Sequence, residues 1–258
     1  ADLAAGLGHE VRGLARGGVL RFDRDEHAAE VAGFVRTSGA HLGVVMSPGG
    51  EDFALVDDRA RVLTDSQAML ALLRLGGERF DGRAVALPVS TTSQAANLVT
   101  EAGGKVRATK IAPAALMEAA REPATVFAVG EGGRFIAADF LPAFDAAATL
   151  VLLLEHLARI DTPLSEVVDD LPSVAMATET VVTPWDQKGA VMRSLMEVSE
   201  GRQVELIDGV KVHHDGGWVL ALPDPDEPVT RIWAEGPDDR EASRLVQEYA
   251  RRIRQMVR

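Results

Sequence analysis

Cysteine is absent from this sequence of 258 residues. Its absence excludes disulfide bridges, thiolate catalysis and zinc sites that use cysteine ligands. A chain without cysteine is typical of a reducing compartment, and the N-terminal residues lack the charged-then-apolar pattern of a secretion signal. We therefore expect a cytoplasmic location.

Long hydrophobic runs are absent as well. The longest apolar stretch, residues 146–158, contains Glu155 and His156 and is shorter than the roughly 20 residues that a membrane-spanning helix needs. Because 47% of all residues are nevertheless hydrophobic, we expect a globular protein with a buried helix in this stretch and no membrane partner.

Positive charge is scarce relative to negative charge. The 27 lysine and arginine residues are outnumbered by 39 aspartate and glutamate residues, so the formal net charge is −12. Nucleic acids and anionic membranes bind positively charged surfaces, so we expect neither as a partner. The same negative field disfavours phosphorylated ligands unless a basic group lies close to the site.

The patterns that are present alternate between strand and helix along most of the chain. We predict an α/β fold class, with mixed-sheet α/β domains followed by a small α+β C-terminal domain. Residues 1–76 form a partial α/β domain in this prediction, residues 77–172 a further α/β domain, and residues 173–258 the α+β domain. The first is partial because its few elements cannot close a core of their own.

Local signals place several boundaries within these domains. A capping box at residues 64–67 predicts a helix start, and the aspartates at 57–58 predict the turn of a hairpin. The Pro/Thr-rich residues 172–185 predict a linker. We expect a single continuous strand over residues 210–222 and an amphipathic helix over 239–257.

Two long stretches, together with the order of the domains, carry a family resemblance. They are "GRFIAADFLPAFDAAATLVLLLEHLA" at 133–158 and "DGVKVHHDGGWVLALPDPDEPVTRIWAEG" at 208–236. The chain resembles the α-D-phosphohexomutase superfamily, the phosphomannomutases and phosphoglucomutases, over the later part of a second domain, a third and a fourth. The resemblance implies enzymes in which a phosphoserine of the first domain exchanges phosphate with a sugar. Nothing in this chain corresponds to that domain.

The resemblance implies a magnesium loop, Asp-Gly-Asp-x-Asp-Arg, at residues 47–52. Ser47, Gly49 and Glu51 stand where the three aspartates would be, and Asp52 replaces the arginine. Because Mg²⁺ prefers clustered oxygen ligands, Glu51 alone is too few for a dedicated site. The alternative is a weak site in which Asp52 substitutes as a further ligand. We expect an ordinary turn without a cofactor, and Mg²⁺ only if the protein is an active mutase.

The resemblance also implies a sugar-specificity loop, Gly-Glu-x-Ser-Gly. The glutamate is retained as Glu131, while the serine is lost, so Glu131 is either a sugar ligand beside its glycines or a solvated turn residue. Where such mutases carry a catalytic Gly-His pair, this chain has Ala112 and Pro113, which cannot exchange protons. We therefore predict no catalytic residue. The residues of the loop are Gly130, Glu131, Gly132, Gly133 and Arg134.

A phosphate loop, Arg-Pro-Ser-Gly-Thr-Glu-Pro-x-x-Arg, is implied near the C-terminus. The retained residues are Pro223, Glu227, Pro228 and Arg231. The replacements are Leu222 for arginine, Asp224 for serine, Pro225 for glycine and Asp226 for threonine. Each new carboxylate would repel a phosphate dianion by roughly 1 kcal/mol or more at partly screened distances. We expect the loop to keep its shape and to lose its phosphate affinity.

Two adjacent histidines, His213 and His214, give weaker evidence of a functional site than the loops do. We expect both to face solvent, and they would make a metal site only if Asp215 or another third ligand lay beside them.

Three functional hypotheses follow. The leading one is a degenerate phosphohexomutase module without mutase turnover by itself, which serves as a regulatory, oligomerisation or weak phosphosugar- or sugar-nucleotide-binding region. It fits a chain fused to a nucleotidyltransferase, as in mannose-1-phosphate guanylyltransferase-like proteins, or a homo-oligomer. The alternative is an active Mg²⁺-dependent mutase, converting hexose 1-phosphate to 6-phosphate, whose serine domain lies outside this chain. The third is a purely structural interaction module.

Overall fold

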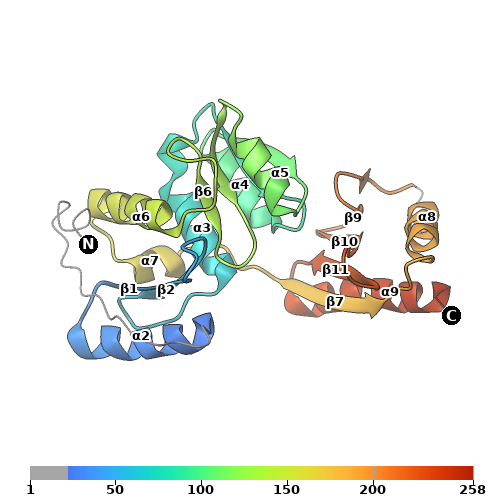
Figure 1. Ribbon diagram of the computed structural model, residues 1–258, viewed down its shortest axis with the longest axis horizontal. Helices are drawn as coiled ribbons and strands as arrows, with labels where there is room; N and C mark the ends of the chain where they lie inside the picture. Colours follow the sequence, from blue (N-terminus) through green and yellow to red (C-terminus); the bar gives the residue numbers. More distant parts are fainter. Residues whose placement is uncertain (1–22, 200, 258) are drawn as a thin grey trace. The chain divides into compact units, whose positions relative to one another are not determined.

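The structure is a computed structural model that describes residues 23–199 and 201–257. The chain divides into two compact units (Figure 1). The first contains the described residues through Leu87 together with 95–107 and 112–172. The second contains residues 88–94, 108–111 and the described residues from 173 onward.

The first unit begins with a helix packed on a two-stranded antiparallel sheet. The helix starts at Asp23, whose side chain accepts hydrogen bonds from two backbone N–H groups, and it ends at Gly39 in the left-handed conformation. Its buried residues Ala32 and Val35 contact Val56 of the sheet. The elements are α2 (Arg24–Ser38), β1 (Leu42–Met46) and β2 (Phe53–Asp57).

A four-stranded mixed sheet, in the order β4-β3-β5-β6, forms the rest of the first unit. Strand β3 runs parallel to β5, and β6 runs antiparallel to β5. All residues of β3 and β5 are buried, as expected for central strands covered on both faces. The elements are α3 (Asp65–Leu75), η1 (Gly77–Arg79), β3 (Ala84–Pro88), α4 (Ser93–Glu101), β4 (Lys105–Thr109), α5 (Pro113–Ala120), β5 (Thr125–Val129), β6 (Phe135–Ala137), α6 (Ala146–Ile160) and α7 (Leu164–Asp169).

The second unit contains a five-stranded sheet in the order β7-β11-β10-β9-β8, and every described pair in it is antiparallel. Helix α9 packs on one face, where Leu245, Tyr249 and Ile253 join a core with Val219 and Ile232 (Figure 1). The elements are β7 (Met176–Val182), α8 (Lys188–Val198), β8 (Val204–Glu205), β9 (Val210–His214), β10 (Gly217–Pro223), β11 (Val229–Glu235) and α9 (Asp239–Met256).

Most elements predicted from the sequence are confirmed. The capping box forms at Thr64 and Gln67, and the chain turns after Asp57, where the Ala60 N–H donates to the Asp57 carbonyl at 2.9 Å. Mixed α/β sheets and a final antiparallel layer confirm the fold class. No helix in residues 23–199 and 201–257 is long and apolar enough to cross a membrane.

Two local predictions are wrong. Residues 172–185 are no linker, because β7 pairs with β11 along its whole length. The prolines that suggested a linker lie just outside the strand, while its threonines and valines suit a strand. Residues 210–222 are two strands rather than one, since the chain reverses at Asp215 and Gly216, where Gly216 has φ +76.

The buried side of β7 provides a direct test of this correction. Val181 is 2% exposed in the core under α9, whereas its neighbour Val182 is 70% exposed. We expect Val181→Ala to lower the free energy of unfolding by about 1–3 kcal/mol, because it removes buried methyl groups. Val182→Ala is the matched control and should change it by less than about 0.5 kcal/mol. Equal effects in urea denaturation would contradict the assignment.

Candidate functional site

The turn between β1 and β2, residues 47–52, uses its polar groups internally. The Ser47 N–H donates to the Asp52 carbonyl at 3.0 Å, and the Gly50 N–H donates to the Ser47 carbonyl at 2.9 Å. The Ser47 hydroxyl also accepts a long hydrogen bond, 3.4 Å, from the Asp52 N–H. Glu51 is exposed. Gly49 has no side chain to offer, so this donor set does not fit a dedicated Mg²⁺ site.

The loop between β5 and β6, residues 130–134, is built from glycines that adopt positive φ. Gly132 and Gly133 have φ of +68 and +73, a region that side chains disfavour. The Gly130 N–H donates to the Arg134 carbonyl at 2.7 Å, and Arg134 Nε donates to the Glu131 carbonyl at 3.0 Å. The backbone of this loop is therefore fixed, while the Glu131 side chain is exposed.

The structure brings these two predicted loops together. The Phe53 N–H donates to the Gly133 carbonyl at 3.1 Å, and Asp52 and Arg134 form an antiparallel β-bridge. The Gly50 carbonyl accepts a further hydrogen bond, at 2.8 Å, from the N–H of Ala146, the first residue of α6. Glu51 and Glu131 thus lie on segments that are held by backbone hydrogen bonds.

Arg24 also holds the loop at residues 130–134, a role that was not predicted from the sequence. Its guanidinium donates to the Gly132 carbonyl at 2.6 Å and forms an ion pair with Asp65 at 2.9 Å. Residues 24 and 132 are far apart in the sequence, and an arginine in the first turn of a helix gives no local signal of this contact.

The third predicted loop, residues 222–231, belongs to the second unit. Asp224 Oδ1 accepts hydrogen bonds from the N–H groups of Asp226 and Glu227, both at 2.9 Å, and Oδ2 accepts from Arg231 Nε at 2.7 Å. The Arg231 guanidinium, followed by these N–H groups, lowers the pKa of the Asp224 carboxyl. Arg231 also pairs with Glu227 at 3.2 Å.

Lys188, at the start of α8, fixes this loop and was also missed in the sequence. Its ammonium donates to the Asp224 and Glu227 carbonyls, at 2.5 and 2.6 Å. It also lies over the ring of Trp185, 3.5 Å from the centroid. The retained prolines frame the loop, since Pro223 ends β10 and the Pro228 carbonyl accepts from Thr183.

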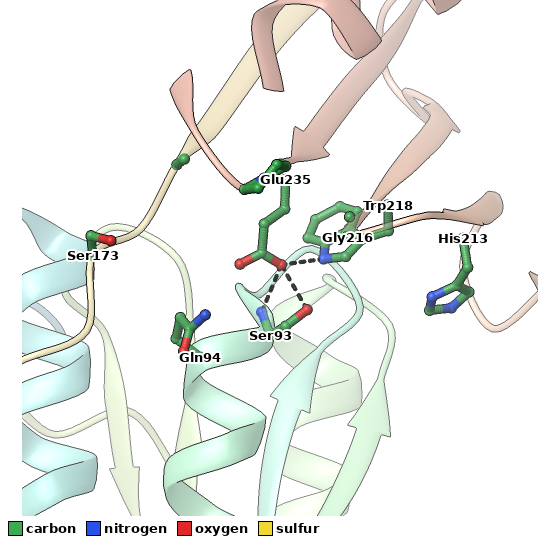
Figure 2. Close-up of a pocket in the computed structure, with 11 residues that line it drawn as sticks. Ser93, Gln94, Ser173, His213, Gly216, Trp218 and Glu235 are labelled. Carbon is green, nitrogen blue, oxygen red and sulfur yellow. Dashed lines mark hydrogen bonds between the residues drawn. The ribbon is translucent and has the colours of Figure 1, made fainter. Parts of the chain in front are cut away.

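A pocket of about 290 Å³ in the second unit was not predicted (Figure 2). Its wall contains the buried Glu235 carboxylate, which accepts from the Thr92 hydroxyl through Oε1. Oε2 accepts from the Ser93 N–H at 2.8 Å, the Ser93 hydroxyl at 2.7 Å and Trp218 Nε1 at 2.5 Å. The donors all belong to the second unit, so the buried Glu235 carboxylate is hydrogen-bonded within that unit.

The residues around this pocket correct the prediction for the histidine pair. His213 lies on the pocket wall and contacts Glu205 at 2.5 Å, and His214 contacts the Tyr249 hydroxyl at 3.0 Å. Both are half-buried rather than solvent-facing. Across the part of the chain that the structure describes, no group of three or more histidine, aspartate or glutamate side chains could hold a metal ion.

Comparisons with known proteins give consistent results. Residues 64–174 match the family described as phosphoglucomutase/phosphomannomutase, alpha/beta/alpha domain III. The chain is 28% identical to a probable phosphoglucosamine mutase of Methanopyrus kandleri, over 91% of this chain and 52% of that protein. It is 26% identical to a phosphopentomutase of Thermococcus kodakarensis, over 86% and 50%. The chain thus spans about half the length of the curated relatives it matches.

Solved structures share the fold. A phosphoglucomutase/phosphomannomutase family protein from Burkholderia thailandensis matches with a TM-score of 0.73 and 23% identity, over 88% of this chain and 49% of that one. The N-acetylphosphoglucosamine mutase of Aspergillus fumigatus, in complex with GlcNAc-6P and magnesium, matches with a TM-score of 0.62 and 13% identity, over 88% and 53%. At these identities the matches show a common fold.

The contact between the two loops of the first unit can be tested at adjacent glycines. A Cβ at Gly133 would lie against the Phe53 carbonyl oxygen, whereas a Cβ at Gly132 would meet no atom within 4 Å. Both positions have positive φ, so each alanine costs about 1–2 kcal/mol of backbone strain. We expect Gly133→Ala to lower the melting temperature clearly more than Gly132→Ala. Equal shifts would argue against the close approach.

The Glu235 contacts predict a second stability difference. A glutamine at this position would keep one acceptor oxygen but could not accept all the donors that now reach the carboxylate, so Glu235→Gln should destabilise the protein by about 1–3 kcal/mol. Glu227→Gln is the matched control, because the Glu227 side chain is 61% exposed. Its unfolding midpoint in urea should stay near that of the parent. Similar midpoints for both variants would contradict the role given to Glu235.

Proposed function

We propose, on the premise that these matches support membership of the α-D-phosphohexomutase superfamily, that the chain is a phosphohexomutase-like module without mutase turnover by itself. In this proposal residues 1–76, 77–172 and 173–258 are its domains. It works in sugar-phosphate or nucleotide-sugar metabolism as a regulatory, oligomerisation or weak sugar-binding region. A sugar nucleotidyltransferase is the enzyme with which we propose it is fused or associated.

The turn at residues 47–52 is the observation that carries this proposal. Resemblance to the family places the magnesium loop here, and hard cations require several oxygen ligands at one point. Ser47 and Asp52 are instead joined by hydrogen bonds within the turn, and Gly49 has no side chain that could act as a ligand. Glu51 is the single carboxylate at a ligand position. A phosphoryl group could not be neutralised by Mg²⁺ held in this way, which argues against turnover.

The loop at residues 130–134 supports the sugar-binding part of the proposal. We propose that the exposed Glu131 carboxylate accepts hydrogen bonds from sugar hydroxyls, on the loop that also contains Gly130 and Gly133. The loop needs no rearrangement for this, because hydrogen bonds to Phe53 and Arg24 already hold its backbone. One carboxylate on a rigid loop gives weak affinity. Relatives with similar sequences are named for phosphoglucosamine and phosphopentose substrates.

A turnover assay tests the proposal directly. The chain is incubated with a hexose 1-phosphate, Mg²⁺ and a hexose 1,6-bisphosphate activator, and hexose 6-phosphate is measured by a coupled enzyme. We expect no product above the enzyme-free rate, and no saturable Mg²⁺ binding by calorimetry. Turnover by this chain or by a longer parent chain would instead identify an active mutase.

A variant of the turn serves as the positive control for metal binding. Ser47→Asp with Gly49→Asp restores carboxylates at the two eroded positions next to Glu51. We expect this double variant to bind Mg²⁺ or Mn²⁺ where the parent does not, because the ligands then cluster on one tight turn. Equal binding by parent and variant would contradict the view that the lost carboxylates abolish the site.

A further inference from the structure

We propose that the Asp224 carboxylate is an intramolecular ligand, which occupies an anion-binding cradle formed by its own loop and so closes the loop to external phosphate. The occupied cradle consists of two backbone N–H groups, those of Asp226 and Glu227, and the Arg231 guanidinium. This inference deepens the proposed function, on which it rests for the choice of phosphate as the external anion. The geometry that carries it is independent of that function.

The geometry is that of a bound oxyanion. Three donors reach one carboxylate at 2.7–2.9 Å: Oδ1 accepts from the N–H groups of Asp226 and Glu227, and Oδ2 accepts from Arg231 Nε. Successive backbone N–H groups combined with a guanidinium are a common way to bind phosphate or carboxylate. The Asp224 side chain is only 12% exposed, so the position is filled from within.

The shape of the cradle does not depend on the carboxylate alone. Lys188 holds the carbonyl groups of Asp224 and Glu227, on the backbone of the same loop. The Asp224 N–H also donates to the Val229 carbonyl at 3.0 Å, and the Val229 N–H donates to the Glu227 carbonyl at 2.8 Å. These backbone contacts remain when the side chain of Asp224 is removed, so the two N–H donors stay in place.

The acidic sequence of the loop suggests that its carboxylates repel phosphate. Occupation of the cradle by the Asp224 carboxylate is a different mechanism. In a repulsion mechanism, Asp224 and Asp226 contribute alike, because both are carboxylates in one turn. In the structure Asp226 is exposed, Glu227 reaches only the Arg231 guanidinium, and Asp224 accepts from all three donors. A free phosphate must displace a group that is tethered within reach, and tethering gives it a high effective concentration. Asp224 is therefore the one carboxylate of this loop that engages all three donors.

Three variants separate the two mechanisms, with inorganic phosphate as the probe in calorimetric titrations of the full chain. Asp224→Ala empties the cradle, whereas Asp224→Asn removes the charge and keeps an oxygen over the two N–H groups. Asp226→Ala removes the same charge from an exposed position. We expect Asp224→Ala to bind phosphate at least about tenfold more tightly than the parent, and the other two to change by less than about twofold.

Several outcomes would overturn the inference. Equal gains for Asp224→Ala and Asp226→Ala would indicate repulsion, and so would a gain for Asp224→Asn that matches Asp224→Ala. Saturable phosphate binding by the parent at this loop would also contradict it. The Asp224→Asn result is decisive even if the alanine variant disturbs the loop, because the asparagine keeps the shape of the side chain.

A second readout checks that the emptied loop persists. Lys188 links the loop carbonyls to the exposed ring of Trp185, so the tryptophan emission, to which Trp218 and Trp233 also contribute, is sensitive to this contact. Formate is small enough to take the position of the missing carboxylate, and it should raise the melting temperature of Asp224→Ala and not that of the parent. If the emission is native-like and neither formate nor phosphate binds, the inference is wrong.

The phosphate titrations can contradict the internal-ligand inference without contradicting the proposed function, and the turnover assay can do the reverse. The turnover and Mg²⁺ measurements depend on the turn at residues 47–52, while the phosphate titrations depend on Asp224. Turnover by the parent together with a tenfold gain in Asp224→Ala would overturn the proposed function alone. Absence of turnover together with no gain would overturn the internal-ligand inference alone.

Discussion

A carboxylate that folding removes from water must be met by hydrogen-bond donors, and this constraint organises both units of a chain with a net charge of −12. In the first unit the fully buried Asp57 side chain accepts from two backbone N–H groups and from the Arg61 guanidinium. In the second, Glu235 is met by hydroxyl, backbone and indole donors. Asp224 follows the same rule in an exposed loop.

These internal contacts bear directly on function. Donors that could bind a phosphate are engaged by Asp224, and the Ser47 hydroxyl accepts a hydrogen bond from the Asp52 N–H within its own turn. The loops therefore keep a definite shape while their polar groups face each other. If these loops are eroded binding sites, as we propose, their polar side chains do more than leave ligands out, because they make contacts that hold the loops.

Elements with strong local signals could be predicted from the sequence, as the capping box at Thr64 and the alternating strand and helix patterns confirm. Predictions failed where the decisive partner is distant. Strand β7 forms because β11 lies beside it. The turn at Asp215 and Gly216 is a different case, since its Asp-Gly pair is a local hairpin signal that the single-strand prediction overlooked. Arg24 and Lys188 gave no signal, because the carbonyl groups to which they donate lie more than 30 residues away.

By itself the sequence determined the fold class and the acidity of the loop at residues 222–231, because these follow from residue type, periodicity and order along the chain. Only the tertiary structure decided which carboxylate matters. Asp224 and Asp226 are chemically equivalent in the sequence, and the backbone directs the first onto Arg231 and two N–H groups and the second to solvent. A hydrogen bond requires a donor that points at its acceptor, and the folded backbone sets where each side chain points.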